Sequence, residues 1–201
     1  RPLGCRSPAS HGALPVCQSC HISENRSPKP RTRRTAKVYA EESLAAKDGG
    51  HMVKTLVLVR HGDPEATSAS GTDLDRRLTA SGARSLKTAY PRTFALLGED
   101  AEAAVWSSPA IRALETAQIV ADAIDVEDIE VHESLYAQDV SAFLAELSDA
   151  EGPIVIAVGH APFVDQLSAR LLGGSPGFGK GAAAAIALPE GFSGTGRLLW
   201  F

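Results

Sequence analysis

Cysteine is absent from residues 52–201, because all three cysteines of this 201-residue chain lie nearer its start. A disulfide framework therefore cannot stabilise that stretch. The chain also has no apolar run near 18 residues, which excludes an ordinary membrane-spanning helix. Basic residues are scarce after residue 51, where 11 Lys and Arg stand against 20 Asp and Glu. That net charge of −9 argues against nucleic acid or an anionic membrane as the main partner.

What the chain does contain is enough apolar sequence to fold. Hydrophobic residues make up 44% of it, which excludes a wholly disordered protein. About 150 residues follow Met52, the only methionine, and this length suits one domain with its own core. We therefore expect a single domain over residues 52–201.

Residues 1–51 have a different composition, with five of the twelve prolines and 9 Lys and Arg against 4 Asp and Glu. They show no sustained hydrophobic period, so we expect a disordered leader with at most a marginal helix around Ala40–Lys47. A secretory signal is disfavoured because the leader lacks the apolar stretch that such signals need. An organelle transit peptide is compatible with the composition, but a tag or upstream extension is the favoured interpretation.

The leader also carries Cys17-Gln18-Ser19-Cys20-His21, which matches the C-x-x-C-H pattern of c-type haem attachment. With His11 nearby, zinc is a second alternative. Haem attachment needs export, and no signal peptide precedes the motif. We therefore expect no cofactor here, with haem or zinc binding as the minor alternative.

Residues 52–201 alternate between short apolar runs and helix-forming segments. Strands are expected at Val53–Val59, Ala103–Trp106, Ile129–Val131, Pro153–Val158, Ala183–Leu188 and Gly196–Phe201. Helices are expected at Leu78–Leu97, from Pro109 to Ile124, at Val140–Leu147 and at Pro162–Leu172. The alternation predicts an α/β fold: a three-layer sandwich with a mostly parallel central sheet and helices on both faces.

Two helix boundaries carry specific signals. Pro91 is expected to kink or break the first helix, because proline removes a backbone donor and clashes with the preceding turn. Ser108 is expected to cap the second helix, with Pro109 in its first turn.

Arginine, histidine and carboxylate side chains follow the expected strands at their carboxyl ends, where open α/β sheets bind ligands. The residues are Arg60-His61-Gly62, Ser107-Ser108-Pro109 with Arg112, His132-Glu133 and Gly159-His160. Each of them alone would more often be structural or merely exposed. Their coincidence at four strand ends predicts one functional site.

The chemistry of these residues points to phosphate. The guanidinium groups of Arg60 and Arg112 offer forked donors that match phosphate oxygens at any physiological pH. A neutral imidazole is a competent nucleophile, and a protonated carboxylic acid can deliver a proton to a leaving group. The set suits cleavage of a phosphate ester or phosphoramidate without a metal.

Three segments carry a family resemblance. Val57-Leu58-Val59-Arg60-His61-Gly62 resembles the signature of the histidine phosphatase superfamily, which has the phosphoglycerate mutase-like fold. The segment from Ser107 to Ala117 resembles the second motif of that family, and Val158-Gly159-His160 resembles the third. The resemblance spans roughly residues 53–188 with the motifs in the right order.

This resemblance implies roles for individual residues. His61 would be the nucleophile that forms a phosphohistidine, and Arg60, Arg112 and His160 would form the phosphate pocket. It also implies that no metal takes part. Glu133 is the nearest match to the family's proton donor, although it is offset from the pattern.

A second set of residues is similar to the short bacterial phosphohistidine phosphatases: Asp63, the run Asp75-Arg76-Arg77-Leu78-Thr79 with Gly82, and Leu135-Tyr136. Asp63 and Arg76 become candidate substrate-binding residues on this basis, and Asp63 is also a second candidate for the acid. The Glu-Arg-x-Tyr-Gly element and long insertion of the mutase branch are absent, which disfavours phosphoglycerate mutase-type phosphotransfer.

We therefore expect residues 52–201 to be a cytoplasmic, metal-independent phosphatase domain. Its partner would be a phosphohistidine-bearing protein or a small phosphomonoester. A non-catalytic phosphate-binding domain of the same fold is the alternative, which the intact set of Arg60, His61, Arg112 and His160 disfavours.

Overall fold

The computed structural model describes residues 53–98, 101–192 and 194–201. The leader, its C-x-x-C-H motif, the marginal helix around Ala40–Lys47 and the boundary at Met52 lie outside the described residues. Within the described ranges, no helix is long and apolar enough to cross a membrane.

Six strands form one sheet in the order β3-β2-β4-β1-β5-β6. They are β1 (Thr55–Arg60), β2 (Ala103–Ser107), β3 (Ile129–Val131), β4 (Ile154–Gly159), β5 (Ala183–Ala187) and β6 (Arg197–Trp200). Strands β3, β2, β4 and β1 are parallel, whereas β5 and β6 complete the sheet as an antiparallel edge. The mostly parallel sheet predicted from the sequence is therefore confirmed.

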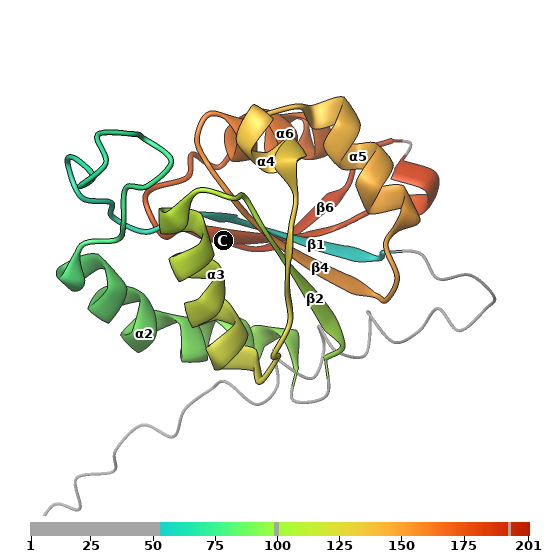
Figure 1. Ribbon diagram of the computed structural model, residues 1–201. Coiled ribbons are helices and arrows are strands. Elements are labelled where there is room, and N and C mark those ends of the chain that lie inside the picture. Colours follow the sequence, from blue (N-terminus) through green and yellow to red (C-terminus); the bar gives the residue numbers. More distant parts are fainter. Residues whose placement is uncertain (1–52, 99–100, 193) are drawn as a thin grey trace, which may run out of the picture. The chain divides into compact units, whose positions relative to one another are not determined.

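Helices cover both faces of this sheet (Figure 1). They are α2 (Ala80–Phe94), α3 (Ile111–Ile124), α4 (Glu133–Ala137), α5 (Val140–Asp149) and α6 (Phe163–Leu172). Helices α2 and α3 pack on one face, and α4, α5 and α6 lie on the other (Figure 1). The three-layer α/β architecture is confirmed.

Strand β1 shows why the apolar runs are continuous. Val57 and Val59 pack with the cluster under α2 and α3, whereas Leu56 and Leu58 pack with the cluster under α4, α5 and α6. All four side chains are fully buried. A strand covered on both faces has no exposed positions, so its sequence loses the polar alternation of a half-buried strand.

Pro91 does not break the helix in which it lies. Helix α2 runs through Pro91 to Phe94 before a 3₁₀ turn over Ala95–Leu97. The proline ring is exposed, while Tyr90 and Phe94 on either side of it are buried in the core. Packing of these two rings holds the last turn in place despite the missing backbone donor.

A short helix that the sequence does not predict follows β3. This helix, α4, has only five residues, which is too short to show helical periodicity. It matters for the site because it begins at Glu133 and carries Tyr136.

Candidate active site

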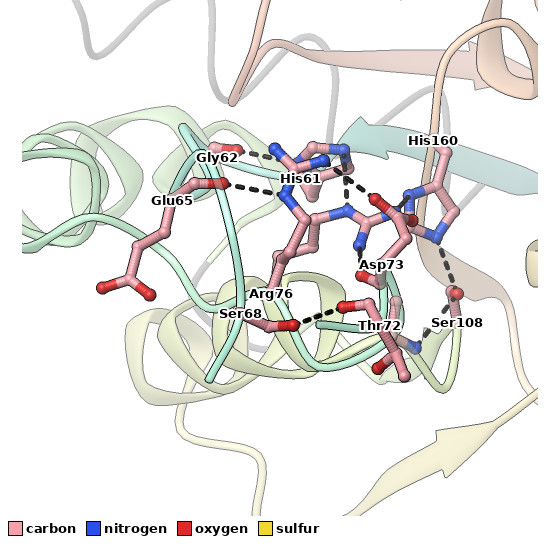
Figure 2. Close-up of polar contacts among 11 residues, drawn as sticks. His61, Gly62, Glu65, Ser68, Thr72, Asp73, Arg76, Ser108 and His160 are labelled. Atoms are coloured by element: carbon pink, nitrogen blue, oxygen red, sulfur yellow. Dashed lines mark hydrogen bonds and ion pairs between the residues drawn. The ribbon is translucent and has the colours of Figure 1, made fainter. Parts of the chain in front are cut away.

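The carboxyl ends of β1 and β4 bring two histidines together. Arg60 of β1 pairs with Gly159 of β4, and the next residues are His61 and His160. The His61 backbone N–H donates to the Gly159 carbonyl at 3.0 Å. The two rings have centroids 5.0 Å apart and are almost completely buried. The ends of these two strands therefore bring His61 and His160 together at one edge of the sheet (Figure 2).

His61 has a defined tautomer. Its Nδ1 lies 2.7 Å from the carbonyl oxygen of Gly62, and a carbonyl can only accept a hydrogen bond. Nδ1 therefore carries the proton and Nε2 keeps its lone pair. The pKa of His61 is lowered from its ordinary value to about 4, mainly by burial and also by the positive charges of Arg112, Arg60 and Arg76, while the Gly62 hydrogen bond acts in the opposite direction. The ring is thus neutral near pH 7, with Nε2 free to act as a nucleophile.

His160 is fixed by a residue that the sequence assigns to another role. Its Nε2 lies 2.7 Å from the Ser108 hydroxyl, and its Nδ1 lies 3.4 Å from Nη2 of Arg112. Burial is the main cause that lowers the pKa of His160 to about 3. Ser108 is not a helix cap, because α3 begins at Ile111 and has no side-chain cap. The expected capping role is wrong: Ser108 directly follows β2, and its hydroxyl contacts the histidine and the Ala110 backbone N–H, which lies before the helix.

Arg112 connects both histidines. Its side chain is only 8% exposed, its Nε lies 3.4 Å from Nε2 of His61, and its Nη2 approaches His160. The remaining donors reach Asp73, with Nη1 at 2.6 Å from the backbone carbonyl and Nη2 at 2.8 Å from the carboxylate. Asp73 is a residue of this site that the sequence reasoning missed.

Arg60 is held from the opposite direction by the Gly-rich loop after α6. Its Nη1 donates to the Phe178 carbonyl at 2.7 Å, while its Nε is buried without a hydrogen-bond partner. A buried donor of this kind is available to an anionic oxygen. The loop itself is anchored by the carboxylate of Asp165, which accepts from the Ser175 hydroxyl and the Phe178 backbone N–H.

The two weaker candidates from the loop after β1 have protein partners. Arg76 donates from Nε to the Glu65 carbonyl and from Nη1 to the Asp73 carboxylate, both at 2.8 Å. Asp63 pairs with Lys180 at 2.5 Å. The hydrogen bond from Lys180 lowers the pKa of Asp63 below its ordinary value, so this carboxylate is ionised at neutral pH.

Glu133 lies at the same edge of the sheet, as the first residue of α4. Its side chain is exposed. Tyr136, one turn further along, packs edge-on to His160 with ring centroids 6.0 Å apart. Helix α4 therefore borders the buried histidine pair.

Thr116 ties the nucleophile's backbone to α3 and is another residue that the sequence reasoning did not single out. Its hydroxyl accepts from the Gly62 N–H at 3.1 Å and donates to the Arg112 carbonyl at 2.7 Å. Thr116 belongs to the second motif, but only the fold shows that its hydroxyl faces Gly62.

These contacts gather positively charged side chains around His61, with the Arg112 guanidinium beside its Nε2. Among the residues that the structure describes, no three His, Cys, Asp or Glu side chains are grouped so that they could hold a metal ion. The arrangement offers one nucleophilic nitrogen, guanidinium donors and a second neutral imidazole, which together can bind and transfer a phosphoryl group.

Comparison with known proteins agrees with this geometry. Residues 56–143 match the family model described as histidine phosphatase superfamily (branch 1). No curated protein matches the chain.

Solved structures give the same result. The protein histidine phosphatase SixA complexed with tungstate is 29% identical, with 73% of this chain and 94% of that chain covered and a TM-score of 0.60. A proposed phosphohistidine phosphatase SixA from Agrobacterium tumefaciens is 21% identical over 75% and 97% of the two chains, with a TM-score of 0.63. The mycobacterial glucosyl-3-phosphoglycerate phosphatase is 19% identical over 73% and 97%, with a TM-score of 0.53. The last two likenesses concern the fold alone.

Proposed function

We propose that this chain is a phosphatase of the histidine phosphatase superfamily, whose model matches residues 56–143, and that it works through a phosphohistidine on Nε2 of His61. The observation that carries the proposal is the 2.7 Å hydrogen bond between Nδ1 of His61 and the Gly62 carbonyl. It leaves the lone pair on Nε2, beside the Arg112 guanidinium.

The reaction has two steps. Nε2 of His61 attacks phosphorus, and a nitrogen–phosphorus bond forms while the bond to the leaving oxygen or nitrogen breaks and its electron pair goes to the leaving group. Water then attacks the phosphohistidine, the nitrogen–phosphorus electron pair returns to Nε2, and inorganic phosphate leaves. Arg60 and Arg112 neutralise the charge on the phosphoryl oxygens in both steps.

Proton transfer is assigned to Glu133. An acid must protonate the leaving group and its conjugate base must then take a proton from the attacking water. Asp63 is ionised and bound to Lys180, so it is poorly suited to supply a proton. Glu133 begins α4, the helix whose Tyr136 packs against His160, and its side chain is exposed, which favours it for this role.

The proposed substrate is a phosphohistidine on a protein, with a small phosphomonoester as the second candidate. SixA, at 29% identity, is described as a protein histidine phosphatase, which supports the first. The mycobacterial structure is of a glucosyl-3-phosphoglycerate phosphatase, and its likeness in fold keeps the second in view. The proposal also includes metal independence and a cytoplasmic location. Activity in the presence of a chelator tests the first, and cell fractionation tests the second.

The function is tested by turnover with His61→Ala. We expect kcat of the variant to be lower by a factor of at least about a thousand, both on a phosphorylated histidine phosphotransfer domain and on an aryl phosphate, because the nucleophile is removed. The matched control is His132→Gln. His132 follows β3 at the same edge, but its ring stacks on Trp106 and pairs with Glu146.

The control variant should keep its activity within about threefold. Full activity in His61→Ala contradicts the mechanism. Phosphate binding by the wild-type protein without turnover on either substrate contradicts enzymatic function and leaves a phosphate-binding domain.

A further inference from the structure

One carboxylate, that of Asp73, holds two arginines of the site at once (Figure 2). Its Oδ1 lies 2.8 Å from Nη1 of Arg76, and its Oδ2 lies 2.8 Å from Nη2 of Arg112. Its backbone carbonyl accepts a third hydrogen bond, from Nη1 of Arg112 at 2.6 Å. The side chain is 55% exposed, whereas that of Arg112 is 8% exposed. An exposed loop residue therefore binds a buried cation through both its carboxylate and its backbone carbonyl.

The donors of Arg112 divide into two edges of the guanidinium plane. The Nη1 and Nη2 edge is taken by Asp73 alone. The Nε and Nη2 edge faces the histidines, with Nε at 3.4 Å from His61 and Nη2 at 3.4 Å from His160. These two contacts are long for hydrogen bonds between nitrogens, whereas those to Asp73 are short. The edge that faces the nucleophile is thus loosely occupied, and the opposite edge is tightly held.

Asp73 is itself fixed from two sides. Next to it, the carbonyl of Leu74 accepts from the Ile111 N–H at 3.0 Å, which ties the loop to the first turn of α3. On the other side, Arg76 spans from the Asp73 carboxylate to the Glu65 carbonyl. The carboxylate is therefore a fixed point against which a long, flexible side chain can be oriented.

We propose that Asp73 is a positioning residue: it binds the outer edge of Arg112 so that the inner edge faces the phosphoryl group on His61. The inference rests on the proposed function in that the inner edge must bind a phosphoryl group. A bidentate arginine contact depends on the orientation of the plane, so a guanidinium free to rotate loses much of its effect. Arg76 supports the same carboxylate from the loop.

A carboxylate on an arginine can also act as an internal competitor of phosphate. The two ideas predict opposite results for Asp73→Asn, which keeps the size of the side chain but removes its charge. Positioning predicts weaker binding of an oxyanion, because Arg112 is less well held. Competition predicts tighter binding, because a rival anion is removed.

The test measures binding of inorganic orthovanadate and phosphate by calorimetry, together with kcat and KM, for wild type and Asp73→Asn. We expect about 10- to 100-fold weaker vanadate binding and a similar loss of kcat/KM, part of it in kcat. The matched control is Asp75→Asn, two residues away, whose carboxylate binds only the hydroxyls of Ser70 and Thr72. It should change both quantities by less than about threefold, and the midpoints of thermal unfolding should show that both variants are folded.

A second measurement separates positioning from a structural effect. In an Arg112→Ala background, Asp73→Asn should have no further effect on vanadate binding, because its action passes through Arg112. Unchanged or tighter vanadate binding in the single variant, or an equal loss in the Arg112→Ala background, overturns the proposal. If the wild-type protein binds neither oxyanion, the proposed function fails first. If it binds them and Asp73→Asn binds them equally well, only the role of Asp73 fails.

Discussion

At the scale of single residues, His61 and His160 are neighbours with opposite tautomers. The Gly62 carbonyl places the proton of His61 on Nδ1. Arg112 can only donate, so Nδ1 of His160 accepts from it, and Nε2 of His160 carries the proton toward the Ser108 hydroxyl. One ring therefore presents a lone pair to the pocket and the other is locked by a serine. The two identical side chains therefore differ in which ring nitrogen carries the proton, because their hydrogen-bond partners differ.

This assignment predicts the effect of Ser108→Ala. Loss of the 2.7 Å hydrogen bond frees the His160 ring to rotate, and we expect kcat/KM to fall about 5- to 20-fold, or about 1–2 kcal/mol. The control is Ser107→Ala, the adjacent serine, which is equally buried but donates to a backbone carbonyl at 2.9 Å.

Ser107→Ala should lower the free energy of unfolding about as much as Ser108→Ala does, but it should leave kcat/KM within about twofold of the wild-type value. Equal activity losses in the two variants would show that the Ser108 hydroxyl has no specific role.

At the scale of elements, the strands and their carboxyl-end residues follow from the sequence, whereas the contacts between loops do not. A continuous apolar run such as that of β1 indicates a buried strand, because both faces of such a strand are covered. The polar loop before α2 offers no such pattern. Asp73 and Asp75 look equivalent in it, and only the fold brings one to Arg112 and the other to two hydroxyls.

The same limit applies to helix starts. Serine is a suitable residue type for a cap. However, the strand before Ser108 extends through Ser107, and α3 starts only at Ile111, three residues after Ser108. The real capping residue of the preceding helix is Thr79, whose hydroxyl accepts from the Gly82 N–H. Capping depends on where the chain turns, which is decided by tertiary packing.

The first turn of α2 gives a prediction at this scale. In a helix interior, alanine is more favourable than glycine by about 1 kcal/mol. Gly82→Ala should nevertheless destabilise the protein by about 1 kcal/mol net, because the added Cβ is overpacked. A Cβ at this position would lie 2.9 Å from the Asp63 carbonyl oxygen and 3.0 Å from the Thr79 hydroxyl. Thr79 is the N-cap of α2, and its backbone N–H donates to that Asp63 carbonyl, so the two neighbours hold the start of the helix against the segment after β1.

Urea unfolding measures this change, with Ser85→Ala on the exposed side of α2 as the control. The control should be as stable as the wild type or slightly more stable. If Gly82→Ala raised the free energy of unfolding, the neighbouring atoms would have moved at little cost, and close packing at this glycine would be unimportant.

At the scale of the whole molecule, the proposed function requires a protein with excess negative charge to bind an anion. Residues 52–201 carry a net charge of −9, yet Arg60, Arg76 and Arg112 are gathered at one end of the sheet. Burial keeps the two histidines between them neutral, with the pKa of His61 lowered to about 4 and that of His160 to about 3. The positive field is therefore local and supplied by groups that do not titrate.

The buried histidines also make global stability depend on pH. In the unfolded chain a histidine takes up its proton near pH 6.5, whereas in the folded protein His61 and His160 resist protonation until about pH 4 and 3. The unfolded state therefore binds more protons below pH 6.5, so the free energy of unfolding decreases as the pH falls. Each histidine should contribute a loss of about 1–2 kcal/mol between pH 7 and pH 5.

Chemical unfolding at several pH values checks this, with the double variant His61→Asn/His160→Asn as the comparison. The variant should lose most of the slope between pH 6.5 and pH 4.5. The carboxylates with lowered pKa, among them Asp63 and Asp73, act at lower pH, below about 4. An unchanged slope in the variant contradicts the buried, neutral state of the two rings.

The central claim is that the phosphoryl group is carried on Nε2 of His61, and the most direct measurement is the chemical identity of the trapped intermediate. The protein is quenched with alkali during turnover, and the phosphorylated residue is located by mass spectrometry and its isomer assigned by ³¹P NMR. The account predicts one phosphohistidine, at His61, bonded through Nε2 because Nδ1 is engaged by the Gly62 carbonyl. A phosphoryl group on Nδ1 of His61, on His160 or on any other residue would contradict it.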